Sequence, residues 1–219
     1  MDKPDLEHAR RYAVRRLEEE LPDVLTYHNL AHTLQGVVPA VERLAAREGV
    51  NGQNLLLLRT AAYYHDTGFV ERSDGHEAIS ARLASEVLPR FGYTPAQIEV
   101  IRGIILATRY PFEPHTRLES IMVDADLDVL GRDDFWSRNR ALRAEREALA
   151  GQRSKDKEWY GGQLAFMRAH RYFTASAQSL RQAHKQRHMD EMAGLLAAAR
   201  KVLPSSICPL ANNSVRPIN

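Results

Sequence analysis

Apolar residues recur along this chain three and four positions apart, which is the period of an α-helix with one buried face. The stripe is clearest over residues 26–47, where it consists of Leu30, Leu34, Val37, Val41 and Leu44. No stretch alternates apolar and polar positions with β-branched residues, as a half-buried strand does. The pattern therefore predicts an all-α fold without a sheet.

Prolines, glycines and capping residues mark where the predicted helices begin and end. The expected helices cover residues 4–20, 26–47, 52–65, 75–91, 94–108, 118–130, 134–150, 158–169 and 174–202. Pro39 lies inside the second helix and should kink or split it, because proline has no amide hydrogen to donate. The third helix is apolar on nearly every side, so we expect it at the centre of the fold.

The length of 219 residues suits one domain, which we place at residues 1–203. Its core should cover about residues 25–131. The sequence then becomes more charged, and we expect the C-terminal helices over residues 133–203 to pack on or beside the core or to form a homodimer surface. Residues 204–219 are rich in proline, serine and asparagine without periodicity, which predicts a flexible tail.

Composition excludes several classes of protein. Hydrophobic residues make up 44% of the chain, yet no apolar run approaches the roughly 18 residues needed to cross a bilayer. The first residues lack the apolar segment of a signal peptide, so we expect a cytoplasmic protein without a membrane partner. The single cysteine, Cys208, excludes a disulfide within the chain and a cysteine-based zinc site. Any metal would have to be held by histidine and carboxylate side chains.

The charge is nearly balanced, with 30 lysines and arginines against 28 acidic residues. Such a balance does not favour nucleic acid as a partner. Residues 138–157 and 181–187 are locally basic. A solvated helix face is the usual explanation for such a run, and attraction of an anionic substrate or partner is the alternative.

Histidine occurs in two segments where it could carry chemistry. His28 and His32 are four residues apart, so on a helix both imidazoles would share one face and could bind a metal or divide metal binding and proton transfer. His65 and Asp66 close the apolar third helix, and Gly68 marks its end. Buried there, they would need hydrogen bonds, ion pairing or a metal to offset the loss of hydration. Each pair taken alone could equally be a surface or capping feature.

Three aspartates, Asp124, Asp126 and Asp128, alternate through an otherwise apolar helix. Apolar residues surround them on every side of the helix, so at least one carboxylate should face inward, where a cation would satisfy it. Together the three segments offer two imidazoles and two carboxylates, a set that suits a divalent ion such as Mn²⁺, Mg²⁺, Fe²⁺ or Zn²⁺. Such a set leaves coordination positions open for water and substrate, as catalytic sites do.

The order of these residues, H…HD…D, resembles the HD superfamily of metal-dependent phosphohydrolases. The opening Tyr-His-Asn-x-x-His also resembles the start of the cyclic-nucleotide phosphodiesterase catalytic domain, and the likeness to HD proteins spans roughly residues 26–131. The resemblance implies a helical bundle around a divalent metal, with Mn, Mg, Fe, Zn, Co and Ni all open. It implies hydrolysis of a phosphoester or phosphoanhydride in a small molecule, commonly a nucleotide.

The resemblance also implies roles for individual residues. The metal ligands would be His32, His65, Asp66 and Asp126, with Asp124 as the rival for the last place. Asp66 or Asp126 would orient the attacking water. His28 matches the histidine that protonates the leaving oxygen in phosphodiesterases, so we expect it to act as general acid.

Four further residues are expected to contact substrate, namely His76, Arg72, Arg109 and His115. His76 falls where some HD proteins place a ligand to a second metal, but Thr108 and its neighbours supply no histidine where the next ligand would come. We therefore favour one tightly held metal. Two alternatives remain open, namely a regulatory or nucleotide-binding HD module without turnover and an HD-type di-iron oxygenase.

Overall fold

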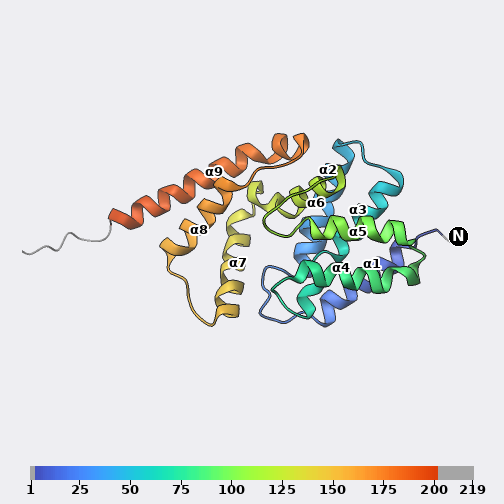
Figure 1. The fold of residues 1–219 in the computed structure, drawn as a ribbon. Helices are drawn as coiled ribbons and strands as arrows, with labels where there is room; N and C mark the ends of the chain where they lie inside the picture. The colour runs from blue at the N-terminus through green and yellow to red at the C-terminus, as the bar shows by residue number, and fades with distance from the viewer. Residues whose placement is uncertain (1–2, 202–219) are drawn as a thin grey trace, which may run out of the picture.

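The structure, a computed structural model, describes residues 3–201, and every regular element in that range is helical (Figure 1). The α-helices are α1 (Leu6–Glu19), α2 (Val38–Arg47), α3 (Gly52–Tyr64), α4 (His76–Val87), α5 (Pro95–Leu106), α6 (Arg117–Asp126), α7 (Phe135–Ala150), α8 (Asp156–Ala169) and α9 (Ala175–Lys201). Shorter π or 3-10 turns are η1 (His32–Val37), η2 (Thr67–Val70), η3 (Leu88–Phe91) and η4 (Asp128–Gly131). The predicted all-α fold is confirmed, whereas Cys208 and the expected tail lie outside the described residues.

Helix α3 lies at the centre of the first six α-helices, as its sequence predicts. It contacts α1, α2, α4, α5 and α6. Leu58 and Ala61 on this helix have no exposed surface, and Tyr64 is 1% exposed. Beyond its exposed first turn, α3 is apolar on nearly every side. Other helices therefore have to surround it, and its last residues lie in the interior.

Helices α7, α8 and α9 lie together beside this bundle and bury a second, smaller apolar cluster (Figure 1). Leu130 from η4, Phe135 from α7, Met167 from α8 and Met192 from α9 meet there. Helix α9 packs on both α8 and η4. The C-terminal helices are thus attached to the bundle directly after α6, the helix that carries the three aspartates.

Pro39 does disturb the second predicted helix, through a π turn rather than a simple kink. The amide of Val38 donates to the carbonyl of Thr33, five residues back, and α2 begins with Pro39 in its first turn. Proline cannot donate the next hydrogen bond, so the wider π spacing absorbs the interruption. His32 stands at the first position of this π turn.

The expected start of that helix at residue 26 is wrong. Residues 26–29 form bends, and helical backbone starts only at Leu30. The side-chain oxygen of Asn29 accepts from the amide of His32 at 3.2 Å, which is how asparagine caps the first turn of a helix. His28 therefore lies before the helix, not one turn below His32 on its surface.

Two glycines allow backbone segments near the candidate site to pack closely against one another. A Cβ at Gly68 would lie 2.1 Å from the carbonyl oxygen of His76, so only glycine lets η2 pack against the start of α4. A Cβ at Gly131 would lie 2.5 Å from the carbonyl oxygen of Arg181, so only glycine lets α9 pack on η4.

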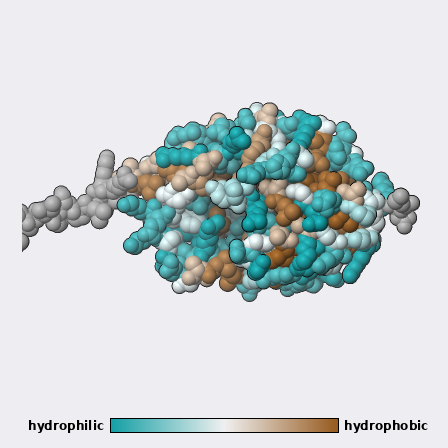
Figure 2. Space-filling model, viewed as in Figure 1, coloured by the Kyte–Doolittle hydropathy of each residue, from teal (hydrophilic) through white to brown (hydrophobic). Residues whose placement is uncertain are grey.

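The surface of the described residues is mixed in character. On the face shown in Figure 2 hydrophilic side chains predominate, with apolar patches scattered among them. No helix within residues 3–201 has both the length and the apolar sequence that crossing a bilayer requires.

Candidate metal centre

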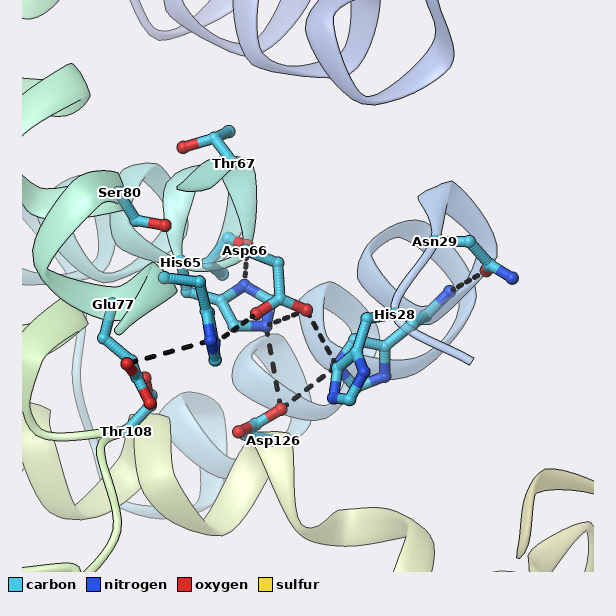
Figure 3. Close-up of polar contacts among 12 residues, drawn as sticks. His28, Asn29, His65, Asp66, Thr67, Glu77, Ser80, Thr108 and Asp126 are labelled. Atoms are coloured by element: carbon cyan, nitrogen blue, oxygen red, sulfur yellow. Dashed lines mark hydrogen bonds and ion pairs between the residues drawn. The ribbon is translucent and has the colours of Figure 1, made fainter. Parts of the chain in front are cut away.

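Four side chains from three elements converge on one point inside the bundle (Figure 3). His32 comes from η1, His65 and Asp66 follow α3 directly, and Asp126 is the last residue of α6. His32 Nε2 lies 3.1 Å from Asp126 Oδ1 and 3.5 Å from Asp66 Oδ2. His65 Nε2 lies 3.2 Å from Asp66 Oδ2 and 3.6 Å from Asp126 Oδ1. Atoms about 2.1 Å from a shared ion would lie roughly 3.0–3.4 Å apart. The two shorter separations fall in this range, and the separations of 3.5 and 3.6 Å lie just above it.

The hydrogen bonds of His65 direct an unshared electron pair into the centre. Its Nδ1 lies 2.8 Å from the carbonyl oxygen of Ala62, so Nδ1 carries the proton and donates it there. His65 Nε2 and Asp66 Oδ2 are both buried and have no hydrogen-bond partner. Two buried electron-pair donors 3.2 Å apart need a proton or a cation between them, and a divalent ion would satisfy both at once.

The charges in the centre favour ionised carboxylates. Burial opposes ionisation of Asp66, but the imidazoles of His65, His76 and His32 together hold its pKa well below the usual range. Burial likewise opposes charge on Asp126, whose pKa is nevertheless lowered by hydrogen bonds with His32 and His65. Burial lowers the pKa of His32, which favours the neutral imidazole that binds metals. For His65 burial acts in the same direction, but the carboxylates of Asp66 and Asp126 outweigh it and raise the pKa, so a metal ion would have to displace a proton from this imidazole. The donor set therefore fits a resident divalent cation.

The three alternating aspartates face three different partners. Asp124 accepts hydrogen bonds from the amides of Phe173 and Thr174 and from the Thr174 hydroxyl, at 2.7–2.9 Å. Asp128 accepts from two arginines. Asp126 alone points toward the imidazoles (Figure 3). Asp124, the rival for the last ligand position, is thus excluded by its direction, and Asp126 occupies the place that the resemblance implies.

His28 approaches the centre from the bend before η1, as part of an aromatic stack. Its ring lies 4.5 Å from that of Phe69 at an angle of 19°, and Phe69 stacks in turn on His76 at 3.9 Å. The ring of His32 is 5.8 Å away. The two histidines therefore do come together, although the helical spacing that predicted this is not the cause.

Sequence reasoning missed the partner of His28, which is Glu145 on α7. The Glu145 carboxylate is hydrogen-bonded to His28 Nδ1 and accepts from the backbone amides of Tyr27 and His28 at 2.8 and 2.9 Å. Burial alone would raise the pKa of Glu145, but these contacts with His28 and Tyr27 bring it below the ordinary value. The sequence signal was weak, because Glu145 is one acid inside a basic stretch 117 residues away from His28.

His76 at the start of α4 contacts the centre through Asp66, and its expected contact with substrate stays a prediction. Its Nε2 lies 3.4 Å from Asp66 Oδ1, and its Nδ1 lies 3.0 Å from the carbonyl oxygen of Ser73. Burial works against a charged imidazole here, but the carboxylate of Asp66 raises the pKa of His76 above its ordinary value. Glu77, the next residue, places a carboxylate oxygen 3.7 Å from His76 Nδ1.

A cavity of about 620 Å³ opens from the centre toward α7 and α8. His28, Asp66, His76 and Asp126 line it at the centre, and Arg138 and Arg146 on α7 line it as well. The guanidinium of Arg138 donates to the carbonyl oxygen of Tyr27 at 3.0 Å. These arginines belong to the basic stretch for which attraction of an anionic substrate was the alternative interpretation.

The other three residues expected to contact substrate lie outside this cavity. Arg72, Arg109 and His115 are exposed, and none of them lines this cavity. Their positions beside the motifs in sequence made them candidates, but turns and loops carry these side chains outward. Thr108 does line the cavity and is buried, with its hydroxyl donating to the carbonyl oxygen of Ile105.

Comparison with known proteins agrees with this architecture. Residues 30–128 match the family model of the HD domain. The fold is similar to the crystal structure of a predicted HD superfamily hydrolase from an uncultured Thermotogales bacterium, with a TM-score of 0.59 and 18% sequence identity. That similarity covers 86% of this chain and 92% of the other chain. No curated protein matches this chain.

Proposed function

Because residues 30–128 match the family model of the HD domain, we propose that this protein is a metal-dependent phosphohydrolase. Its substrate would be a nucleotide or another small phosphoester or phosphoanhydride. One observation carries the proposal, namely the convergence of two imidazoles and two carboxylates on a point where His65 Nε2 and Asp66 Oδ2 lack any partner. Such an arrangement is costly in a folded protein unless a proton or a metal ion lies between these atoms, and a divalent ion would serve all four side chains at once.

The metal would be held by His32, His65, Asp66 and Asp126. A bound divalent ion would lower the pKa of water and polarise a phosphoryl oxygen of the substrate. The mixed imidazole and carboxylate set is compatible with Mn²⁺, Fe²⁺, Zn²⁺, Co²⁺, Ni²⁺ or Mg²⁺. Asp66 also has its second oxygen directed toward His76, so this carboxylate can orient a water molecule where the cavity meets the metal centre.

His28 is the residue that we assign to proton transfer. Glu145 engages its Nδ1, which leaves Nε2 as the nitrogen available to the cavity that His28 lines. In the imidazolium form, Nε2 would donate a proton to the leaving oxygen while Glu145 stabilises the positive charge. Stacking on Phe69 fixes the plane of the ring, so the direction of donation is set before substrate binds.

Arg138 and Arg146 replace the expected surface residues as candidate contacts for substrate phosphate. Both line the same cavity as the centre. Arg138 is already positioned by its hydrogen bond to Tyr27 and by lying 4.7 Å above the ring of that residue. A guanidinium held in this way can donate to phosphate oxygens with little further ordering.

A metal-by-substrate screen tests the proposal. The protein would be loaded separately with Mn²⁺, Mg²⁺, Co²⁺, Ni²⁺, Fe²⁺ or Zn²⁺ and incubated with nucleotides and simple phosphoesters. Product chromatography would detect both released phosphate and cleaved diesters. We expect turnover that disappears in the Asp66→Ala variant and persists in the matched control His184→Ala, since His184 is partly exposed on α9.

Three other results would each contradict the proposal. Nucleotide binding without turnover in any metal would indicate a regulatory module. Two bound irons with oxygen consumption would indicate an oxygenase, although Thr108 supplies no imidazole at the position where a second metal would take one. Turnover that survives Asp66→Ala would place the chemistry elsewhere.

A further inference from the structure

The outer half of the cavity differs in chemistry from the metal centre. Its walls come from α7, α8 and the loop before α6, and they include the aromatic side chains of Tyr110, Phe112, Phe135, Trp159 and Phe166. Phe112 and Phe166 both lie within 6.5 Å of each other and of Tyr110, measured between ring centroids. A region of this kind accepts a planar or apolar group rather than a second phosphate.

A chain of hydrogen bonds crosses this region and has a defined direction. Trp159 Nε1 donates to Asn139 Oδ1 at 2.9 Å, and Asn139 Nδ2 donates to Gln163 Oε1 at 2.9 Å. An indole nitrogen can only donate, so Asn139 must present its oxygen to Trp159 and its NH₂ to Gln163. Gln163 must then accept through its oxygen.

With its oxygen accepting from Asn139, Gln163 has its side-chain amide nitrogen left to donate a hydrogen bond. Its amide nitrogen donates to no other residue within the described range, and Gln163 lines the cavity. Trp159 and Asn139 are 8% and 5% exposed, so the chain behind Gln163 is fixed inside the protein. The buried hydrogen bonds therefore determine that Gln163 presents its amide nitrogen, a hydrogen-bond donor, to the cavity.

A glycine beside Gln163 leaves open space in the cavity wall. Gly162 precedes Gln163 on α8 and also lines the cavity, and a Cβ added there would meet no atom within 4 Å. Glycine weakens the interior of a helix, so its position at the cavity wall is better explained by the room that it leaves than by helix stability.

The charges along the wall limit how much phosphate the cavity can take. Among the described residues, Arg138 and Arg146 are its arginine or lysine side chains, whereas Asp66, Asp126 and other carboxylates also line it. Two arginines suit one phosphoryl group better than a triphosphate.

We propose that the outer half of the cavity binds a nucleobase-like planar ring of a substrate with one phosphoryl group, and that Gln163 donates a hydrogen bond to an acceptor on the edge of that ring. This inference rests on the proposed function, because it assigns the phosphoryl group to the metal centre. An aliphatic group is disfavoured as the occupant, since it would cover the Gln163 amide without accepting its hydrogen.

Binding can be measured through Trp159 itself. The chain has two tryptophans, so the Trp136→Phe variant leaves Trp159 as the reporter inside the cavity. Stopped-flow quenching with metal-loaded protein would give the affinity before turnover. The probes are adenosine and guanosine 5′-monophosphate and, for comparison, n-hexyl phosphate, which carries the same phosphate without a ring or an acceptor edge.

We expect both nucleotides to bind at least about tenfold more tightly than n-hexyl phosphate. Gln163→Leu should weaken nucleotide binding about tenfold and change n-hexyl phosphate binding by less than about twofold. Gln163→Glu keeps the acceptor for Asn139 and replaces the free donor by an acceptor, so it should weaken nucleotide binding further. The matched control Gln53→Leu, at an exposed position on α3, should change neither affinity.

Two results would overturn the inference, namely equal affinity for n-hexyl phosphate and the nucleotides, or an equal effect of Gln163→Leu on all three probes. Gln163 is half-buried, and thermal melting of both variants would verify that they fold. Nucleotides that bind as expected but are never cleaved would sustain the planar-ring site and refute the phosphohydrolase. Phosphoesters that are cleaved without preference for a ring would do the reverse.

Discussion

Asp126 ends α6 and Asp128 begins η4 two residues later, yet the two carboxylates have opposite surroundings. Asp128 is 2% exposed, and its two oxygens accept hydrogen bonds from Arg43 and Arg181 at 2.7–2.9 Å. Asp126 faces two imidazoles, one of which belongs to the pair of unpartnered atoms in the centre. Asp128 has all its hydrogen-bond partners within the protein. Asp126 belongs to a cluster in which two buried atoms have no hydrogen-bond partner.

We infer from this difference that Asp128 stabilises the fold, whereas the cluster around Asp126 binds a ligand. Arg43 lies on α2 and Arg181 on α9, so Asp128 ties the C-terminal helices to the bundle. Buried polar groups in folded proteins are nearly always paired, and exceptions concentrate at sites of function. We therefore expect substitutions in the two places to act on different quantities, metal and turnover in one and stability in the other.

The largest effect is expected for Asp66→Ala or His65→Ala. Each removes one of the two unpartnered atoms, so bound metal should be lost and turnover should fall by roughly 10⁴-fold or more, the scale on which removal of a whole catalytic unit acts. The free energy of unfolding without metal should fall less than when the ion pairs of Asp128 are lost. His65→Ala removes the hydrogen bond to the Ala62 carbonyl oxygen, which contributes about 1 kcal/mol, and Asp66→Ala removes the contact with His76. Metal analysis, steady-state kinetics and urea unfolding would measure all three. A variant that keeps its metal would contradict the ligand assignment.

His28→Ala should have the next largest effect. It should retain the metal while turnover drops by ~10²–10⁴-fold, the usual range for a general acid. Glu145→Gln, which keeps the shape but not the charge opposite His28, provides the companion measurement and should also lower turnover with metal retained. If His28→Ala instead empties the metal centre, the division of labour between His28 and His32 is wrong.

Asp128→Ala should destabilise the protein without abolishing turnover by the folded fraction. Removing one partner of a buried ion pair costs about 3–5 kcal/mol, and the partial exposure of Arg43 and Arg181 places this case near about 3 kcal/mol. Urea unfolding measures the loss, and kinetics at low temperature measures the activity that remains. Loss of metal with an unchanged free energy of unfolding would show that Asp128 supports metal binding and not the stability of the fold.

His170 is the exception to the comparison, and its effect is the smallest of the four within a single pH unit. It is buried in the C-terminal helices, its Nε2 has no partner, and its Nδ1 lies 3.0 Å from the ammonium of Lys185. Burial and then Lys185 lower the pKa of His170 to about 3. Below pH 6.5 the unfolded chain therefore binds a proton that the folded chain refuses, and stability should fall by about 1.4 kcal/mol per pH unit from this group.

The readout for His170 is the pH dependence, not the stability at one pH. The difference in unfolding free energy between the wild type and His170→Gln should shift in favour of the variant as the pH falls from 6.5 toward 4. A difference that stays constant over this window would show that His170 takes up a proton in the folded state.

Local sequence signals predicted most of the helices and the three segments of the centre. The Thr94-Pro95 start of α5 and the apolar circumference of α3 are properties of short stretches, and both are seen in the structure. The start of the second helix was misplaced because Asn29 caps it, a role that an asparagine inside a periodic stretch does not reveal.

Contacts between residues distant in sequence determine which side chains face the site, and local patterns do not predict these contacts. Asp124 and Asp126 are equivalent on a helical wheel that is apolar all round, and the choice is made by Thr174, which lies 50 residues beyond Asp124. The pairing of Glu145 with His28 and the placing of Arg138 in the cavity likewise depend on how α7 packs. Such contacts follow from the tertiary fold and leave no periodic trace in the chain.

The central claim is that His32, His65, Asp66 and Asp126 hold one divalent cation between them. The most direct measurement is an anomalous difference map from crystals grown with Mn²⁺ or Zn²⁺, recorded on either side of the absorption edge. The account predicts one strong peak about 2.0–2.2 Å from His32 Nε2, His65 Nε2 and one oxygen each of Asp66 and Asp126. A fully loaded crystal with its peak elsewhere, or with none at this point, would contradict it.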